Sequence, residues 1–156
     1  MRAANEALGR LHTVTDEIHH GFRRGRELGF PTANLGPRPQ GLIPADGVYA
    51  GYATVTAQDP SHAGDEPLAG APATISIGTN PTFEADGAPR RTVEAYVLGD
   101  HDLHLYGDTV RLEFVEFQRP TLKFDSIDAL VEQMAEDVEV TRRTLEAERS
   151  RSDLGS

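Results

Sequence analysis

The sequence predicts a mainly β fold, an antiparallel barrel completed by one helix near its C-terminal end. Two observations indicate this class. Short β-rich segments follow one another without the strand–helix alternation of a doubly wound sheet. Toward the end of the chain, apolar residues instead recur at three- and four-residue spacing, as in a helix that packs against a sheet. The length of 156 residues is that of one domain with a substantial core.

The expected strands begin at residue 11, and a loosely alternating segment at 11–18 suits the first of them. Residues 21–44 are rich in Gly, Pro and Arg without a sustained period, so they are predicted to form a long loop. Such a loop inside a compact domain is usually functional or disordered, and its specific residues favour function. A turn is expected at 78–82. The remaining strands are predicted at residues 48–55, 73–77, 93–98 and 109–117.

A C-terminal helix is predicted to begin after Asp125 or Ser126, either of which can cap it. From about Glu148 onward the chain has nothing to bury, so residues 149–156 are expected to be a disordered tail. A short helix is also expected within residues 1–10, which leaves 11–148 as the folded domain. The apolar stripe of the C-terminal helix is expected to comprise Ile127, Leu130, Val131, Met134, Val138 and Leu145.

Composition narrows the possible functions. A net charge of -10 argues against nucleic acid as a partner, because such binding neutralises phosphates with basic side chains. No apolar run is long enough to cross a bilayer, and the N-terminus has no signal-peptide core, which makes the cytoplasm the expected location. Lys123 is the only lysine, so no Gly-Lys-Ser/Thr phosphate loop exists, and nucleotide binding would need another scaffold.

The segment 21–34 combines glycines and arginines in a pattern suited to phosphate. Glycines let backbone N–H groups approach an anion, and arginines supply forked donors. Thr32 and Asn34 add two neutral oxygens on one side of an extended segment, and Mg²⁺ accepts such oxygens together with phosphates and water. An ordinary glycine-rich loop remains the alternative interpretation of these residues.

Glu94 is a glutamate inside a β-rich segment, where that residue type is disfavoured. One interpretation is a general base that accepts the proton of an attacking hydroxyl; the other is a solvent-facing carboxylate. Glu113 and Glu116 compete for the same role, although the alternation of their strand already explains their polarity.

A third segment of interest combines Tyr106 with residues 117–124, where aromatic side chains flank Arg119. Aromatic rings beside an arginine can bind a flat ring system by stacking. Phe117 and Phe124 are equally consistent with burial beneath the helix. The histidines form no metal-binding spacing, and His19-His20 is interpreted as a surface pair.

Taken together, and in the order in which they occur along the chain, these segments resemble the riboflavin kinase family. The resemblance is in particular to the C-terminal kinase module of bacterial bifunctional FAD synthetases. The resemblance covers about residues 4–145 and depends on several motifs rather than one. They are the glycine-rich lead-in to Pro31-Thr32-Ala33-Asn34, then 44–51, 76–83, Val93-Glu94, 105–107, Arg119-Pro120 and 123–126.

The resemblance implies a six-stranded Greek-key barrel with a C-terminal helix, and a kinase that moves the ATP γ-phosphate to the 5′-hydroxyl of riboflavin, giving FMN and ADP. It implies Mg²⁺ as the metal, no tightly bound organic cofactor, and no nucleic-acid or membrane partner for a monomeric module. By resemblance, Glu94 is the catalytic base and Arg119 and Phe124 bind the flavin. Thr32 and Asn34 contact Mg²⁺, and the nucleotide lies against Gly21, Gly25, Arg26, Thr32, Asn34 and Tyr106.

Two departures from the family pattern are visible. Thr121 stands where many relatives have glutamate, which affects the expected flavin contacts, and the connection at 58–72 is long. Residues 1–10 resemble the linker that follows the adenylyltransferase half, so the chain is expected to make FMN but not FAD. A silent flavin-sensing module would be expected to lose Glu94 or Thr32, and both are present.

Overall fold

The chain is represented by a computed structural model that describes seven ranges of residues. Of residues 79–83, 89–91 and 151–154 only the backbone is described. The described ranges are 12–19, 33–35, 43–64, 67–83, 89–98, 106–122 and 125–154.

Six strands, one short 3₁₀ helix and one long α-helix make up the described part. The strands are β1 (His12–His19), β2 (Ala33–Leu35), β3 (Gly47–Ala57), β4 (Ala71–Phe83), β5 (Pro89–Val97) and β6 (Thr109–Arg119). The helices are η1 (Pro60–His62) and α3 (Ile127–Leu154).

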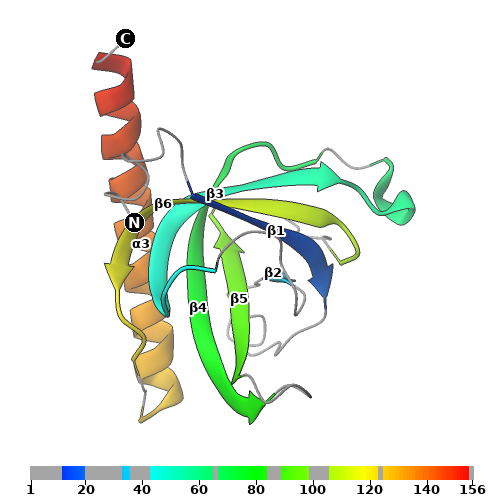
Figure 1. Cartoon of the computed structure of the whole chain (residues 1–156). Coiled ribbons are helices and arrows are strands. Elements are labelled where there is room, and N and C mark those ends of the chain that lie inside the picture. The colour runs from blue at the N-terminus through cyan, green and yellow to red at the C-terminus, as the bar shows by residue number, and fades with distance from the viewer. Residues whose placement is uncertain are drawn as a thin grey trace.

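The strands close into an antiparallel barrel in the order β1-β2-β5-β4-β3-β6, with α3 standing along one side (Figure 1). Strands β3, β4 and β5 follow one another as hairpin-linked neighbours, and β6 returns to pair with β3. That arrangement is a Greek key. The barrel class, the six strands and the C-terminal helix predicted from the sequence and the resemblance are therefore confirmed.

Two expectations about local structure are wrong. The predicted loop at 21–44 contains β2, a short strand whose Ala33 pairs with Ala95 of β5 and whose Leu35 pairs with Ile18 of β1. The turn predicted at 78–82 belongs to β4, which continues to Phe83 opposite β5 and loses its regular register only after Asn80. In both cases distant partner strands supply the backbone hydrogen bonds, which no local pattern reveals.

The barrel interior is filled by side chains that alternate inward along each strand. Ile75, Ile77 and Leu112 are completely buried, and the rings of Tyr49 and Phe114 meet edge to face at 5.2 Å. Gly51 lies where β3 approaches β6 so closely that a Cβ would be 2.1 Å from the Glu113 carbonyl oxygen. Only glycine permits that approach, which keeps the small barrel closed.

The outer face of the barrel is covered by α3, which packs on β3, β4 and β6. Leu145 is buried against Ala50 and Val115, as the apolar stripe predicts, whereas Ile127 is 54% exposed at the start of the helix. The helix also continues to Leu154, beyond the point where the sequence predicts a tail. The guanidinium of Arg149 lies 5.8 Å from the ring centroid of Tyr52, a contact that ties this last part to the barrel. In the described chain, no helix is long and apolar enough to span a membrane.

Candidate functional site

A cavity of about 190 Å³ lies between the outer face of the barrel and α3. Its apolar lining comes from β3, the segment after β6, and α3: Val48, Leu122, Leu130, Met134 and Val138. Its polar lining consists of Thr74, Ser76, Glu94, Tyr96, Arg119, Thr121 and Asp137. An apolar hollow with a few convergent polar groups is typical of a small-molecule site.

A line of residues in register crosses five strands of the barrel. Arg119 lies opposite Val48, Val48 opposite Ser76, Ser76 opposite Glu94, and Glu94 opposite Asn34. Directly opposite residues of antiparallel strands place their side chains on the same face. In β2, β3, β4 and β5 the residues next to the line point into the core, so its members there lie on the outer face. Arg119 lies on the same face, because its side chain contacts Asp137 of α3. At roughly 4.8 Å per strand, about 14 Å of sheet separates Arg119 from Glu94, and Asn34 lies one strand further.

Glu94 is placed on this face by its neighbours in β5, since Val93 and Ala95 are buried in the core. Its side chain is half-buried in the cavity wall, and burial raises the pKa of the Glu94 carboxyl above its ordinary value. Among the described residues, none donates a hydrogen bond to this carboxylate. Glu94 can therefore accept a proton without first giving up a partner in that part of the chain.

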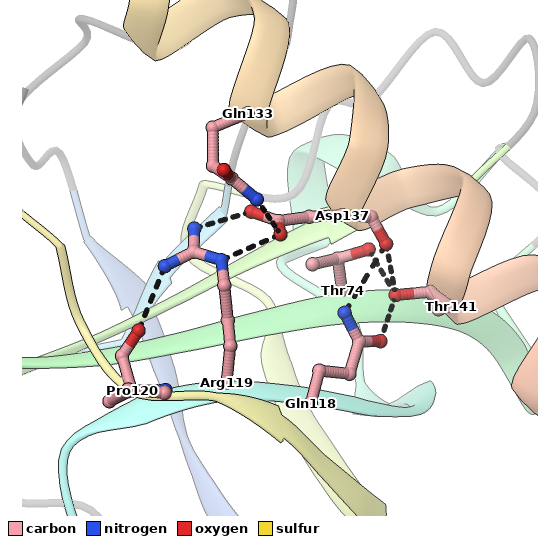
Figure 2. A network of polar contacts seen from close by, with 7 residues as sticks. All are labelled: Thr74, Gln118, Arg119, Pro120, Gln133, Asp137 and Thr141. Atoms are coloured by element: carbon pink, nitrogen blue, oxygen red, sulfur yellow. Dashed lines mark hydrogen bonds and ion pairs between the residues drawn. The ribbon is translucent and has the colours of Figure 1, made fainter.

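Where Arg119 of β6 meets α3, Arg119 and Asp137 form a bidentate ion pair (Figure 2). This part of the cavity is its helix end. Arg119 donates from Nε to Asp137 Oδ1 at 2.7 Å and from Nη2 to Oδ2 at 2.6 Å. Its Nη1 donates to the Pro120 carbonyl oxygen at 2.9 Å, and Gln133 Nε2 donates to Asp137 Oδ1 at 3.0 Å. The geometry is the bidentate one that makes arginine–carboxylate pairs strong and directional.

The same network continues into the barrel wall through Thr141. Its hydroxyl lies 2.5 Å from Gln118 Oε1, 2.7 Å from Thr74 Oγ1 and 2.9 Å from the Asp137 carbonyl oxygen (Figure 2). Thr141 is fully buried, so these contacts replace water at its hydroxyl. They join β4, β6 and α3, and so fix the helix that closes the cavity.

A separate cluster anchors the long connection between β3 and β4 to the corner that carries Tyr106. The Asp108 carboxylate, almost fully buried, accepts from the Asp59 backbone N–H at 2.6 Å and contacts His62 Nδ1 at 2.8 Å. At Gly107, with φ of +90°, a Cβ would lie 2.6 Å from Asp59 Oδ2. The corner is therefore tightly packed against the connection.

Of the residues predicted for the site, Asn34, Glu94 and Arg119 lie in the line across the barrel face. Tyr106 is 57% exposed at the corner before β6 and does not line the cavity. Glu113 and Glu116, the competing candidates for a base, also lie outside the cavity lining. The other predicted residues fall outside the described part of the chain: Gly21, Gly25, Arg26, Thr32 and Phe124.

Sequence reasoning missed several polar members of the cavity: Thr74, Ser76, Tyr96 and Asp137. A signal for Asp137 was present, because this acid shares the buried face of α3 with Met134, Val138 and Thr141 at helical spacing. An acid on such a face requires a partner. In the described ranges, no group of three or more His, Cys, Asp or Glu residues is arranged for metal binding.

The barrel and its helix-covered cavity, with a carboxylate in the wall, are features of a protein that binds a small ligand. Residues 8–145 match the family described as Flavokinase, riboflavin kinase. The chain is 36% identical over 142 residues to the bifunctional riboflavin kinase/FMN adenylyltransferase of Listeria monocytogenes, covering 91% of this chain and 41% of that protein. The chain belongs to the riboflavin kinase family.

Solved structures agree with the fold. Riboflavin kinase from Trypanosoma brucei superposes with a TM-score of 0.61 at 28% identity, covering 86% of this chain and 79% of that one. A Streptococcus pneumoniae protein described as a macrolide-efflux protein gives a TM-score of 0.74 at 34% identity, covering 90% of this chain and 41% of that one. The chain thus spans about two fifths of the length of the Listeria and Streptococcus proteins.

Proposed function

We propose that this chain is a riboflavin kinase, transferring the γ-phosphate of ATP to the 5′-hydroxyl of riboflavin and producing FMN and ADP. The observation that carries the proposal is Glu94, a half-buried carboxylate without a donor in the described chain. It lies in the wall of a small-ligand cavity, on the side away from Arg119, which is the strand end of the cavity. Membership of the riboflavin kinase family identifies the ligand class.

The proposed pose follows the line across the barrel face. The flat flavin ring lies under α3, between apolar side chains such as Leu122 and Met134, with Arg119 at its edge and Phe124 as a second flavin-binding residue. The ribityl chain then runs across β3 and β4 toward Glu94. Arg119 and Glu94 are separated along the sheet by three strand intervals, which together span roughly 14 Å. That span suits an elongated molecule with a ring at one end.

The proposed chemistry needs one proton acceptor and good alignment. The Glu94 carboxylate takes the proton of the 5′-hydroxyl, the hydroxyl oxygen forms a bond to the γ-phosphorus, and the bond to the β-phosphate oxygen breaks in line. ADP leaves, and the proton on Glu94 passes to solvent. A carboxyl whose pKa is raised by burial is a better acceptor near neutral pH than an exposed one.

The nucleotide is proposed to lie beyond Glu94, where Asn34 occupies the next strand. The Asn34 amide oxygen is a hard neutral ligand of the kind Mg²⁺ accepts, and Thr32 is its proposed partner. When bound, Mg²⁺ supplies charge neutralisation at the phosphates. The remaining proposed nucleotide contacts are Gly21, Gly25, Arg26 and Tyr106.

The proposal includes no tightly bound organic cofactor and a monomer in the cytoplasm. The test is to incubate the purified chain with riboflavin, ATP and Mg²⁺ and separate the products by chromatography. FMN and ADP are expected in equal amounts. Absence of FMN, with Glu94→Gln as the matched inactive reference, would overturn the proposed activity.

A further inference from the structure

The Arg119 side chain is fixed before any ligand arrives. A guanidinium carries five N–H bonds, and three of them are used, two on the Asp137 carboxylate and one on the Pro120 carbonyl oxygen. Within the described part of the chain, the other two N–H bonds, one on each Nη atom, have no acceptor and are left for a ligand. A flexible arginine normally loses rotamer freedom when it binds, and here the fork to Asp137 has already removed that freedom.

Asp137 is in turn held from the helix side. Only 6% of the residue is exposed, and Gln133, one turn earlier on α3, donates to its Oδ1. The backbone carbonyl of Asp137 accepts hydrogen bonds from Gln118 and Thr141, which connect it to β6 and, through Thr74, to β4. The position of the Asp137 carboxylate is therefore set by the docking of α3 on the barrel. Its two hydrogen bonds from Arg119 then fix the orientation of the guanidinium.

The pair also sets the charge at this end of the cavity. The guanidinium and the carboxylate cancel, so the cavity presents oriented N–H donors and a flat guanidinium face without net charge. Such a wall suits a flat, uncharged heteroaromatic ring with acceptor atoms at its edge. We propose that Asp137 is a positioning residue that holds Arg119 in the orientation required by the flavin ring. This inference rests on the proposed function, because that function identifies the ring.

A positioning role at the ring end has a specific kinetic consequence. Asp137 acts on Arg119, which lies about three strand intervals from Glu94, the proposed base. Asp137→Asn keeps the size of the side chain but cannot accept both Arg119 donors. It should raise the KM for riboflavin by about tenfold and leave kcat within about twofold, the pattern of a lost binding interaction.

The experiment uses two probes and four variants. Riboflavin and lumiflavin, which has the same ring without the ribityl chain, are titrated by flavin fluorescence into wild type, Asp137→Asn, Arg119→Lys, the double variant and Glu139→Gln. Glu139 is the matched control, a carboxylate on the same helix that pairs with Arg142 and Arg143 at the exposed surface. Melting temperatures and FMN production are measured for each protein.

The expected result is an equal loss of about tenfold for both probes in Asp137→Asn, with no change in Glu139→Gln. Because Asp137 acts through Arg119, the double variant should lose little more than Arg119→Lys alone. Additive losses, an unchanged lumiflavin affinity, or a fall in kcat at constant KM would overturn the proposal. If Asp137→Asn does not fold, Gln133→Ala decides, since unchanged lumiflavin affinity in that variant also overturns it. Wild type that makes no FMN contradicts the proposed function instead.

Discussion

Two carboxylates line the same cavity in opposite circumstances. Asp137, at the helix end, receives two hydrogen bonds from Arg119 and one from Gln133. Glu94, at the strand end, receives none from the described residues, and burial raises its pKa. Asp137 is held in a bidentate ion pair with Arg119, whereas Glu94 is a desolvated carboxyl that takes up a proton more readily than an exposed one.

Because their surroundings differ, the two carboxylates are suited to different roles within one small site. A carboxylate surrounded by donors is fixed in place, so it is suited to orient a neighbour. A carboxylate without donors is suited to exchange protons. Variants at and beyond the two ends of the cavity test this difference.

The largest effect is expected from Glu94→Gln. The amide keeps the shape of the side chain but cannot accept the hydroxyl proton, so turnover should fall by about two to four decades, as for a lost general base. Riboflavin affinity should change little. Steady-state FMN production and a fluorescence titration measure the two quantities. Near-normal turnover would mean that another group, or water, accepts the proton.

Next in size is Thr141→Val, which probes the buried network behind Asp137. It leaves the Thr74 hydroxyl and the Gln118 amide oxygen without their partner, so the free energy of unfolding should fall by about 1–3 kcal/mol in urea titrations. Thr144→Val, at a half-buried position on the same helix, is the control and should cost much less. Equal losses would mean that the network does not stabilise the docking of α3.

Asn34→Ala tests the strand end beyond Glu94. If Asn34 is a Mg²⁺ ligand, the variant should bind a non-hydrolysable ATP analogue about tenfold more weakly in Mg²⁺, with little change in EDTA. Ser76→Ala, from the same line of residues but on the Arg119 side of Glu94, should show no such metal dependence. Equal penalties in both buffers, measured by calorimetry, would identify Asn34 as a structural residue.

The smallest effect concerns stability and pH. Because burial raises the pKa of Glu94 above 4.5, the folded chain holds this proton more tightly than the unfolded chain does. The stabilising contribution is therefore complete below the unfolded pKa and is lost as pH rises through the folded one. Glu94→Gln, neutral throughout, should melt a few degrees higher than wild type at pH 7.5, about the size of a 1 kcal/mol change. The gap should close toward pH 4.5, and the exposed Glu132→Gln should show none.

Periodicity was sufficient to predict the barrel class and most strands, because alternation in β6 and the helical stripe of α3 are local properties. It could not predict β2, whose three residues depend on β1 and β5 for their hydrogen bonds. It could not choose among Glu94, Glu113 and Glu116 either. All three lie in β-rich segments, and only the docking of α3 determines which outward residue becomes part of a cavity wall.

The predicted site residues show the same contrast between what a local motif predicts and what depends on distant parts of the chain. Arg119 was predicted from its motif, and the structure adds its partner Asp137, which lies 18 residues further along the chain. No local sequence pattern links two residues so far apart, although an acid on the buried face of a predicted helix was visible in the sequence. Tyr106, by contrast, was predicted from its motif and lies at an exposed corner outside the cavity lining.

The register line from Arg119 to Asn34 also constrains which changes of chain length the molecule tolerates. Its five members come from five strands, and the insertion of one residue within any of these strands would turn the following side chains from the outer face to the core. The connection between β3 and β4 contributes no member, so its length can vary while the line stays intact. Length variation compatible with the site is therefore confined to the connections between strands, and a single inserted residue inside β4 would be more damaging than many added beyond Ala57.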